Sequence, residues 1–403
     1  MVDEKGLTDF FEGYLKKDFV FTNRKVLQSN YMPENIHYRE NEIKQIANIL
    51  APSLKMEKPS NLFIYGRTGT GKTLCVKYVI KNMLELSKKK DINLRIFYLN
   101  CKLKRIADTE YRLLAQLTRE FGGEVPATGL PTDEVYKGFI RHLDGKKQLL
   151  IIVLDEIDQL VNKIGDEILY NLTRLNSELD NSEISLVGIS NDMVFADNLD
   201  PRVKSSLSEE ELVFSPYNAV QLQKILKERA GIAFKEEVIG EGVIEKCAAY
   251  AAKEHGDARR ALELLRISGE LVERTNKKKV TLEHIDSAEE KIERDRIVDI
   301  VNSQPKQFKL TLYAIFEMVL KANKCIFTGD IYDIYKNYCF RTGDRPLTQR
   351  RLSDIVAELD MLGIINAKVI SKGRYGRTRE ICLAIPNSAA AKINNMLKED
   401  LNL

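Results

Sequence analysis

The sequence lacks the residue patterns that mark zinc centres, export signals and membrane spans. Its six cysteines and four histidines are scattered, and no two cysteines form a C-x-x-C pair. This pattern argues against a zinc site and favours reduced, mostly buried thiols. No apolar run approaches the roughly 18 residues of a transmembrane helix, and the first residues lack a basic segment followed by an apolar one. These absences favour a cytoplasmic protein that does not span a membrane.

Charge is unevenly distributed along the 403 residues, although the net charge is only +3. Residues 301–403 carry 16 Lys and Arg against 10 Asp and Glu, whereas the rest of the chain carries 46 against 49. The length accommodates two or three domains, and 44% apolar with 30% charged residues fits a globular protein. A basic C-terminal region indicates a polyanionic partner at that end, although solvated basic faces are also common.

Residues 62–73 combine a short apolar strand with the pattern G-x-x-x-x-G-K-[ST], which is typical of phosphate-binding loops. The glycines allow a tight turn whose N–H groups face an anion, and the following helix adds its positive dipole end. Lys72 is predicted to bridge the β- and γ-phosphates of ATP, and the Thr73 hydroxyl to hold Mg²⁺. A chance glycine-rich turn would not explain both flanking elements. The predicted nucleotide-binding residues of the loop are Gly66, Arg67, Thr68, Gly69, Thr70, Gly71, Lys72, Thr73 and Leu74.

The segment upstream of the loop is a candidate for the apolar slot that a nucleotide base needs. It leads into a stretch with helical spacing from Ile43 onward. The alternative is an ordinary N-terminal helix that packs on the sheet, and the local sequence does not decide between the two. The candidates for contact with the nucleotide are Tyr31, Pro33, Ile36, His37 and Arg39, together with Tyr217 farther along the chain.

Residues 149–154 form a continuous apolar run, as expected of a parallel strand buried on both faces. The run ends in Asp155 and Glu156, at the end of the strand where α/β sheets place their ligands. Asp155 is suited to bind Mg²⁺, and Glu156 to orient and polarise an attacking water. An acidic helix start would explain Asp155 alone, but not the buried run before it.

Further strands are expected at residues 94–100, 185–190 and 211–214. Asn191 follows one of them, where an amide can hydrogen-bond a γ-phosphate or a water, or form an Asx turn instead. Arg202 follows a proline and could supply a cation to a transition state across a subunit contact. It could equally be a surface ion-pair residue.

After residue 216 the composition becomes helical and rich in alanine, with helices expected at 218–230, 236–252 and 257–274. A long charged helix is expected from Thr281 to about residue 301, followed by the last domain boundary. The expected organisation is a flexible N-terminus (1–14), a nucleotide-binding core (15–215), a helical lid (216–296) and a C-terminal domain (297–403).

The C-terminal domain has the pattern of a winged helix. An apolar stripe (Leu352, Ile355, Val356, Leu359, Leu362) marks one helix, and Gln349, Arg350 and Arg351 lie in its first turn, where a recognition helix meets DNA. Two strands then flank a basic tip, and residues 366–381 carry five basic residues against Glu380. A protein-interaction module with an incidentally basic hairpin is the alternative. The predicted DNA contacts of the tip are Lys372, Arg374, Tyr375, Arg377 and Arg379.

Taken together, these motifs resemble the AAA+ class of P-loop ATPases, which has an extra strand between the phosphate-loop strand and the acidic strand. The order of core, lid and winged helix, with D-P-R-V-K-S-S-L and G-D-A-R-R-A-L, is similar to the archaeal origin-recognition initiators. The resemblance spans residues 15–390 and implies an α/β AAA+ core with a parallel sheet. It also implies that Asn191 is the sensor-1 residue, Arg202 the arginine finger and Arg259 the sensor-2 arginine, with Arg260 directed elsewhere.

That family also contacts DNA through an insertion in the core, which the resemblance places after residue 100, with Lys102, Lys104 and Arg105 as candidates. These lysines and arginine could instead be ordinary surface charge. The expected function is a nucleoid-associated replication initiator that binds origin double-stranded DNA, uses ATP, ADP and Mg²⁺, and hydrolyses ATP slowly as a timer. The implied partners are a paralogous initiator or a second copy on adjacent sites, and the replicative minichromosome-maintenance helicase.

Three other functions are compatible with parts of this pattern. A DNA motor of the branch-migration type also joins an AAA+ core to a winged helix. A nucleotide-switched transcription or signalling regulator would read promoters or control assembly. A clamp loader fits less well, because this chain has a winged helix and no cysteine-paired zinc module.

Overall fold

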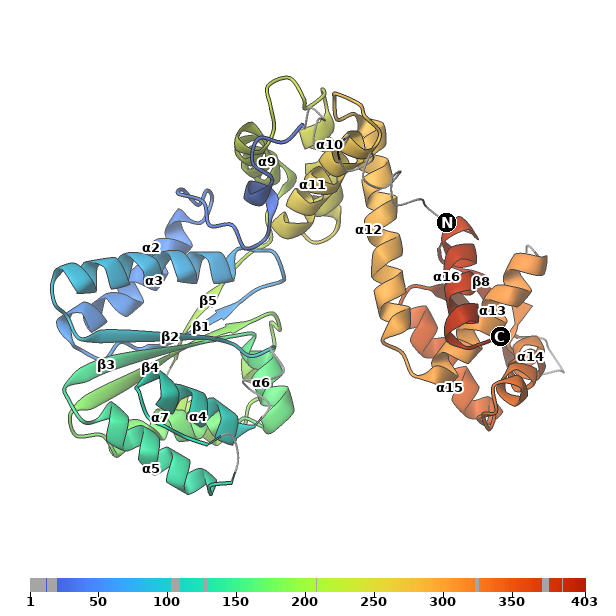
Figure 1. Cartoon of the computed structure of the whole chain (residues 1–403). Coiled ribbons are helices and arrows are strands. Elements are labelled where there is room, and N and C mark those ends of the chain that lie inside the picture. Colours follow the sequence, from blue (N-terminus) through green and yellow to red (C-terminus); the bar gives the residue numbers. More distant parts are fainter. Residues whose placement is uncertain are drawn as a thin grey trace. The chain divides into compact units, whose positions relative to one another are not determined.

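The computed structural model describes residues 12, 20–102, 109–126, 129–207, 209–322, 326–371, 377–385 and 387–403. The chain forms two compact units, Met1–Ile285 and Asp286–Leu403, and helix α12 (Leu282–Asn302) contains the boundary between them. The first unit holds a sheet with helices on both faces and a separate group of helices, and the second is largely helical (Figure 1).

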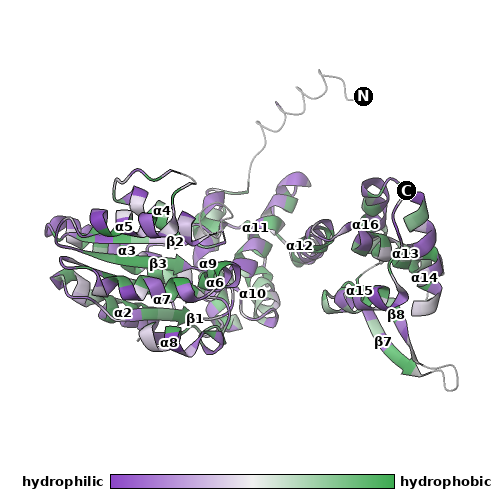
Figure 2. Cartoon of the chain, turned by 90° about the horizontal axis from the view of Figure 1, so that it is seen from below, coloured by the Kyte–Doolittle hydropathy of each residue, from purple (hydrophilic) through white to green (hydrophobic). Residues whose placement is uncertain are grey.

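The sheet of the first unit has five parallel strands in the order β2-β3-β4-β1-β5. All eight residues of β3 are buried, as expected of an apolar run inside a parallel sheet, and the hydropathy colouring in Figure 2 marks this strand as hydrophobic. The predicted parallel α/β core is therefore confirmed. The strands are β1 (Asn61–Tyr65), β2 (Leu94–Asn100), β3 (Gln148–Asp155), β4 (Ser182–Ser190) and β5 (Glu209–Val213).

Each face of the sheet has its own hydrophobic core. Successive residues of a strand point to opposite faces, so Phe63 enters one core and its neighbours Leu62 and Ile64 enter the other. The carboxyl ends of β1, β3 and β4 meet at one edge of the sheet, where polar residues follow each strand. The helices are α2 (Glu40–Leu50) and α3 (Lys72–Lys89) on one face, and α4 (Glu110–Glu120), α5 (Thr132–Leu143), α6 (Ile157–Ile164) and α7 (Glu167–Arg174) on the other (Figure 1).

The lid consists of α9 (Ala219–Ala233), α10 (Val243–Lys253) and α11 (Ala258–Arg274), which confirms the predicted helical lid. Helix α9 begins with a capping box between Asn218 and Gln221. The second helix starts at Val243 instead of the expected residue 236, because residues 238–240 hydrogen-bond to Val280. The short helix η1 (Arg24–Leu27) packs against the lid, so the segment after it runs from the lid toward the core.

The second unit is a winged helix, as predicted. Its antiparallel sheet has the strand order β6-β8-β7, and the predicted stripe of α15 is buried from Leu352 to Leu359. Leu362 departs from that stripe and is 38% exposed, because α15 ends at Met361. The elements are α13 (Lys306–Ala322), β6 (Ile326–Phe327), α14 (Thr328–Arg341), α15 (Gln349–Met361), β7 (Ile365–Ser371), β8 (Arg377–Leu383) and α16 (Asn387–Asp400).

Among the described residues, Cys75, Cys101, Cys247 and Cys339 are buried, and burial raises the pKa of the Cys75 thiol to about 12. Cys382 is disulfide-bonded, so the expectation of reduced thiols is wrong for that residue. Cys382 follows Ile381, which pairs with Ile326 of strand β6 in the sheet. The spacing of the cysteines along the sequence does not reveal that these two segments lie side by side. Across the described residues, no helix has both the length and the apolar character needed to cross a bilayer.

Candidate functional site

The loop between β1 and α3 forms a cradle of the size and polarity that suits a phosphate group. Gly69 and Gly71 have φ values of +71° and +94°, a left-handed conformation that residues with a Cβ rarely adopt. Gly71 is the N-cap of α3, so the free N–H groups of the first helical turn open toward the loop. The Thr70 hydroxyl donates to the Arg67 carbonyl oxygen at 2.8 Å and closes the turn.

Lys72 lies beneath this loop and is only 5% exposed. Its Nζ donates to the carbonyl oxygens of Gly66 and Arg67 at 2.6 and 2.8 Å, and to Asn191 Oδ1 at 3.0 Å. Burial, together with the nearby positive charge of Arg259, lowers the pKa of Lys72 to about 8, against the opposing effect of nearby acidic groups. The amine therefore joins the loop to the end of β4.

Two hydroxyl groups converge on Asp155, which ends β3 and is 5% exposed. Thr73 Oγ1 donates to Asp155 Oδ2 at 3.1 Å, and the Tyr98 hydroxyl also donates to Oδ2. The Thr73 hydroxyl and the Asp155 carboxylate are oxygen ligands of the kind that Mg²⁺ prefers. The residues present thus fit a magnesium site next to the loop.

Glu156 follows β3 in a left-handed conformation, with φ of +58°, which is unusual for a residue with a side chain. Its carboxylate lies 3.5 Å from Asn100 Nδ2 and 3.8 Å from Lys102 Nζ. Both partners come from the end of β2 and the turn after it. Lys102, a predicted DNA contact, therefore approaches the acidic pair in this structure.

Asn191 lies beside Lys72 at the end of β4. Besides accepting the hydrogen bond from Lys72, it donates its backbone N–H to Asp158 Oδ1 at 3.4 Å. The same carboxylate oxygen accepts a hydrogen bond from the Ser190 hydroxyl at 3.2 Å. Asp158, in the first turn of α6, therefore fixes the backbone that presents the Asn191 amide.

The two adjacent arginines of the lid have different surroundings. Arg259, in the first turn of α11, lines both the phosphate-loop cavity and the apolar cavity beside it. Arg260 forms an ion pair with Glu254 at 3.0 Å. Their backbone N–H groups are both capped by Asp257, at 2.7 and 3.2 Å.

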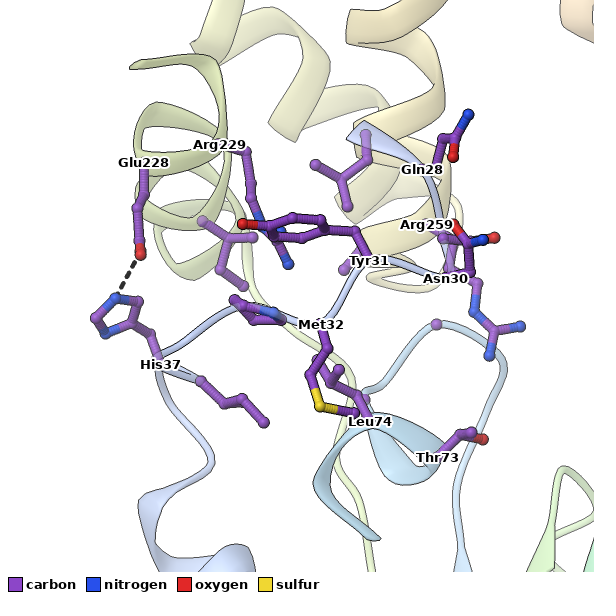
Figure 3. Close-up of a pocket in the computed structure, with 18 of the residues that line it drawn as sticks. Gln28, Asn30, Tyr31, Met32, His37, Thr73, Leu74, Glu228, Arg229 and Arg259 are labelled. Atoms are coloured by element: carbon purple, nitrogen blue, oxygen red, sulfur yellow. Dashed lines mark ion pairs between the residues drawn. The ribbon is translucent and has the colours of Figure 1, made fainter. Parts of the chain in front are cut away.

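An apolar cavity of about 180 Å³ adjoins the phosphate loop and separates the lid from the core. In Figure 3, Tyr31 and Met32 lie between the lid helix that carries Glu228 and Arg229 and the helix that carries Thr73 and Leu74, and Arg259 extends toward the loop. The guanidinium of Arg229 lies 4.5 Å from the centroid of the Tyr31 ring. The predicted residues that line this cavity are Tyr31, Pro33, Ile36, His37, Gly69, Gly71, Thr73, Leu74, Tyr217 and Arg259.

Arg39, predicted as a nucleotide contact, lies behind the loop and is buried among protein groups. It donates to the carbonyl oxygens of Thr70 at 3.0 Å and Ser215 at 2.5 Å, and forms an ion pair with Glu42 at 2.6 Å. Its guanidinium also lies 4.1 Å from the centroid of the Tyr217 ring. Arg39 therefore supports the loop and the connection to the lid.

Arg202 lies apart from these cavities, in the helix α8 (Pro201–Leu207). Its side chain is 86% exposed and makes two hydrogen bonds of 3.1 Å to the carboxylate of Asp200. This pairing lowers the pKa of Asp200. Within the described part of the chain, Arg202 is not among the residues that line the phosphate-loop cavity.

The predicted recognition helix α15 begins as expected, with Thr348 as N-cap accepting from the Arg351 N–H at 3.3 Å. Gln349 and Arg350 are exposed, whereas Arg351 lies 3.6 and 3.7 Å from two acidic groups of the same helix. Arg379 donates to the Ser353 carbonyl oxygen at 3.0 Å and so ties β8 to α15.

Several predicted DNA contacts are not placed by the structure. Arg377 is the first residue of β8, where its backbone pairs with Ser371. Five others lie outside the described residues: Lys104, Arg105, Lys372, Arg374 and Tyr375.

Sequence reasoning did not identify Tyr98, Asn100, Asp158, Glu228 or Arg229 as parts of the site. A signal existed for two of them, because Tyr98 and Asn100 alternate on one face of β2, and Asn100 pairs with Asp155 in the sheet. The lid residues carried no comparable signal, since their approach to the loop depends on the tertiary fold.

Comparisons with known proteins agree with this architecture. The sequence matches the AAA domain over residues 55–191, the Cdc6 AAA+ ATPase-type lid domain over 223–290 and the CDC6 C-terminal winged helix domain over 299–392. It is 49% identical over 406 residues to the ORC1-type DNA replication protein of Thermococcus onnurineus, covering 100% of this chain and 96% of that protein. It is 50% identical over 401 residues to the protein of that name from Pyrococcus furiosus, covering 98% and 94%.

A solved structure of the Aeropyrum pernix ORC1 protein in complex with DNA is also similar, with a TM-score of 0.81 and 43% identity over 95% of this chain and 98% of that chain. The resemblance to the origin-recognition initiators is thereby confirmed. Since relatives of this identity span nearly its whole length, this chain belongs to the Orc1/Cdc6 family of ORC1-type DNA replication proteins.

Proposed function

We propose that this protein is a DNA replication initiator that binds origin double-stranded DNA, under the control of ATP binding and slow ATP hydrolysis. One observation carries the proposal: Lys72, Thr73 and Asp155 of the core line one cavity together with Arg259 of the lid. The same chain ends in a winged helix. The similarity to an ORC1 protein in complex with DNA supports the DNA-binding part.

The nucleotide site has separate places for a base, phosphates and Mg²⁺. The apolar cavity suits an adenine base, the loop suits the phosphates, and Thr73 with Asp155 suits the metal. When bound, MgATP supplies an anhydride bond whose cleavage is assisted by neutralised phosphate charge. Lys72 contributes a buried positive charge, and Arg259 brings a second one from the lid.

Four further side chains complete the proposed chemistry. Glu156 orients the attacking water, Asn191 and Arg259 sense the γ-phosphate, and Arg202 acts from a second copy. The Glu156 carboxylate lies 3.5 Å from Asn100 Nδ2 and 3.8 Å from Lys102 Nζ, and these contacts restrain the proposed general base. A restrained general base supports slow hydrolysis, which suits a timer better than a motor.

We assign DNA binding to one region in each unit: the first turn of α15 with the wing in the second unit, and the segment that follows β2 in the first. Gln349 and Arg350 are exposed at the start of α15, where side chains of a recognition helix reach bases and phosphates. We assign DNA contacts to Lys102, Lys104 and Arg105 and, in the wing, to Lys372, Arg374, Tyr375, Arg377 and Arg379. This role implies two protein partners, a second initiator on an adjacent site and the replicative helicase. It also implies that the protein is located at the nucleoid.

Two measurements with the full-length protein test the proposal. Labelled ATP should bind the wild-type protein and bind Lys72→Ala much more weakly, because the buried charge at the phosphates is lost. Sheared fragments of the source genome, captured by the protein at physiological salt and sequenced, should be enriched in origin DNA. Capture without any preference for origins would contradict the initiator role and favour a regulator or a motor.

A further inference from the structure

The lid touches the phosphate loop at a second place, next to Arg259. Arg67 Nη1 lies 2.6 Å from His255 Nδ1, and the Ala258 N–H donates to the Gly69 carbonyl oxygen at 3.2 Å. His255 and Ala258 belong to the turn 255–258, which leads from α10 into the first residue of α11. The tip of the loop, residues 67–69, is therefore held by this turn through one side-chain contact and one backbone contact.

The turn packs against the loop more closely than a side chain at position 69 would allow. A Cβ atom added to Gly69 would lie 1.7 Å from Asp257 Oδ1. The Asp257 carboxylate is itself fixed, because it accepts the N–H groups of Arg259 and Arg260 as the N-cap of α11. The contact with the loop is thus coupled to the first turn of the helix that carries Arg259.

His255 has a left-handed backbone conformation. Its φ is +72°, a value that histidine adopts more often than most residues with a Cβ but that glycine adopts at lower cost. A guanidinium group can only donate hydrogen bonds, so Nδ1 of His255 is the acceptor in this contact. Backbone strain at a functional site persists where surrounding contacts hold it in place.

We propose that the Arg67–His255 contact is a latch that keeps the lid on the phosphate loop and slows the release of nucleotide. The inference rests on the proposed function, in which this loop binds ATP and ADP. Loop and lid residues line the same cavity, so separating them would open the cavity in which the nucleotide is proposed to lie. Arg67 and His255 act as positioning residues through the turn 255–258.

The rate of ADP release from the full-length protein tests the latch. Fluorescently labelled ADP is bound, chased with excess unlabelled ADP, and followed by stopped flow. His255→Gly removes the acceptor and relieves the backbone strain, and should speed release about two- to tenfold, the effect of losing one hydrogen bond. His255→Asn should restore release close to the wild-type rate, because Asn Oδ1 can accept from nearly the position of Nδ1 and asparagine tolerates left-handed φ.

A double-mutant cycle assigns the effect to the pair. Arg67→Ala should also speed release, and Arg67→Ala combined with His255→Gly should add little to either single change. Asn276→Gly is the matched control, since Asn276 also lies in the lid with φ of +54° but follows the opposite end of α11. It should leave the rate unchanged.

Three results would overturn the latch: an unchanged release rate in His255→Gly, equal acceleration in Asn276→Gly, or fully additive effects of the two latch variants. Failure of the wild-type protein to bind labelled ADP at all would instead remove the proposed nucleotide function. The two failures are therefore distinguishable in the same experiment.

Discussion

At the scale of single residues, the contact of Tyr98 with Asp155 is the feature most directly tied to the proposed metal site. A buried carboxylate needs hydrogen-bond donors to offset its lost hydration. Thr73 and Tyr98 supply two donors to Asp155. Burial, together with this hydrogen bond, raises the pKa of Tyr98, so the phenol stays protonated and donates at any physiological pH. Tyr98 thereby fixes the orientation of a proposed metal ligand.

Replacing Tyr98 with Phe should weaken Mg²⁺-dependent ATP binding by about tenfold, as expected when a partner of a metal ligand is lost. ATP affinity measured over a series of Mg²⁺ concentrations would reveal the change. Tyr136→Phe is a matched control, because the Tyr136 hydroxyl also donates to a carboxylate, that of Glu110, away from the site. An identical Mg²⁺ dependence in Tyr98→Phe and wild type would show that Tyr98 does not position Asp155.

The lowered pKa of Lys72 predicts a pH dependence of nucleotide binding. Its pKa of about 8 lies below the ordinary 10.5, so between these values the unfolded chain holds more protons and the Lys72 contribution to folding stability rises with pH. The pH dependence of ATP binding has the opposite sign, because the phosphates of the nucleotide favour the charged ammonium form of Lys72. ATP affinity should therefore fall as the pH rises above about 8, with proton uptake on binding visible by calorimetry in buffers of different ionisation enthalpy. A constant affinity across that pH would contradict the role of Lys72.

At the scale of elements, Arg39 joins three segments: the start of α2, the phosphate loop and the residues that lead from β5 to the lid. Its three polar partners and its stacking on Tyr217 are all protein groups. Removing one member of a buried charged pair leaves its partners unsatisfied, which is costly. Arg39 should therefore matter for stability as well as for the shape of the loop.

Arg39→Ala should lower the free energy of unfolding by about 3 kcal/mol, the usual cost of breaking a buried ion pair. Arg39→Lys should not restore stability, because an ammonium cannot reach the three acceptors as a planar guanidinium does. Lys44→Ala, at an exposed position of α2, the helix that Arg39 precedes, should change stability by less than about 0.5 kcal/mol. Denaturant unfolding measures all three. Equal stability of Arg39→Ala and Lys44→Ala would refute this assignment.

The elements that sequence predicted well are those with a local signal. The phosphate loop, the buried run of β3 and the helix α11 all have their patterns within a single stretch of chain. The start of α10 and the partners of Tyr98 and His255 could not be predicted in this way. Tyr98 and its partner are 57 residues apart, and Arg67 and His255 are 188 residues apart. The alternation along β2 indicates the face on which Tyr98 lies, but which residue it contacts depends on the tertiary fold.

At the scale of the whole molecule, the uneven charge supports the proposal that the C-terminal domain binds DNA. The basic C-terminal domain is a winged helix. In the described part of this domain, Arg350 of the predicted recognition helix has no acidic partner within the helix. Arg351, by contrast, lies near two carboxylates. Composition predicted the polyanionic partner, and motif order predicted the family. Neither predicts which arginines are already engaged by acidic neighbours.

Arg350→Ala should lower the affinity for duplex DNA and flatten the dependence of log K on log salt by about one, as for the loss of a single phosphate contact. Lys336→Ala is the control, since Lys336 lies in the same domain but is paired with Asp333 at 2.9 Å. Fluorescence anisotropy at several salt concentrations gives both slopes. An unchanged slope in Arg350→Ala would remove this residue from the DNA interface.

The central claim is that nucleotide bound at Lys72, Thr73 and Asp155 controls how the protein holds DNA. The most direct measurement is the Kd of the full-length protein for an origin duplex, with ATP and with ADP, for wild type and for Lys72→Ala. We predict two different affinities for the wild type and a single affinity for Lys72→Ala. Equal affinity of the wild-type protein in both nucleotides, under conditions where each is shown to bind, would contradict the claim.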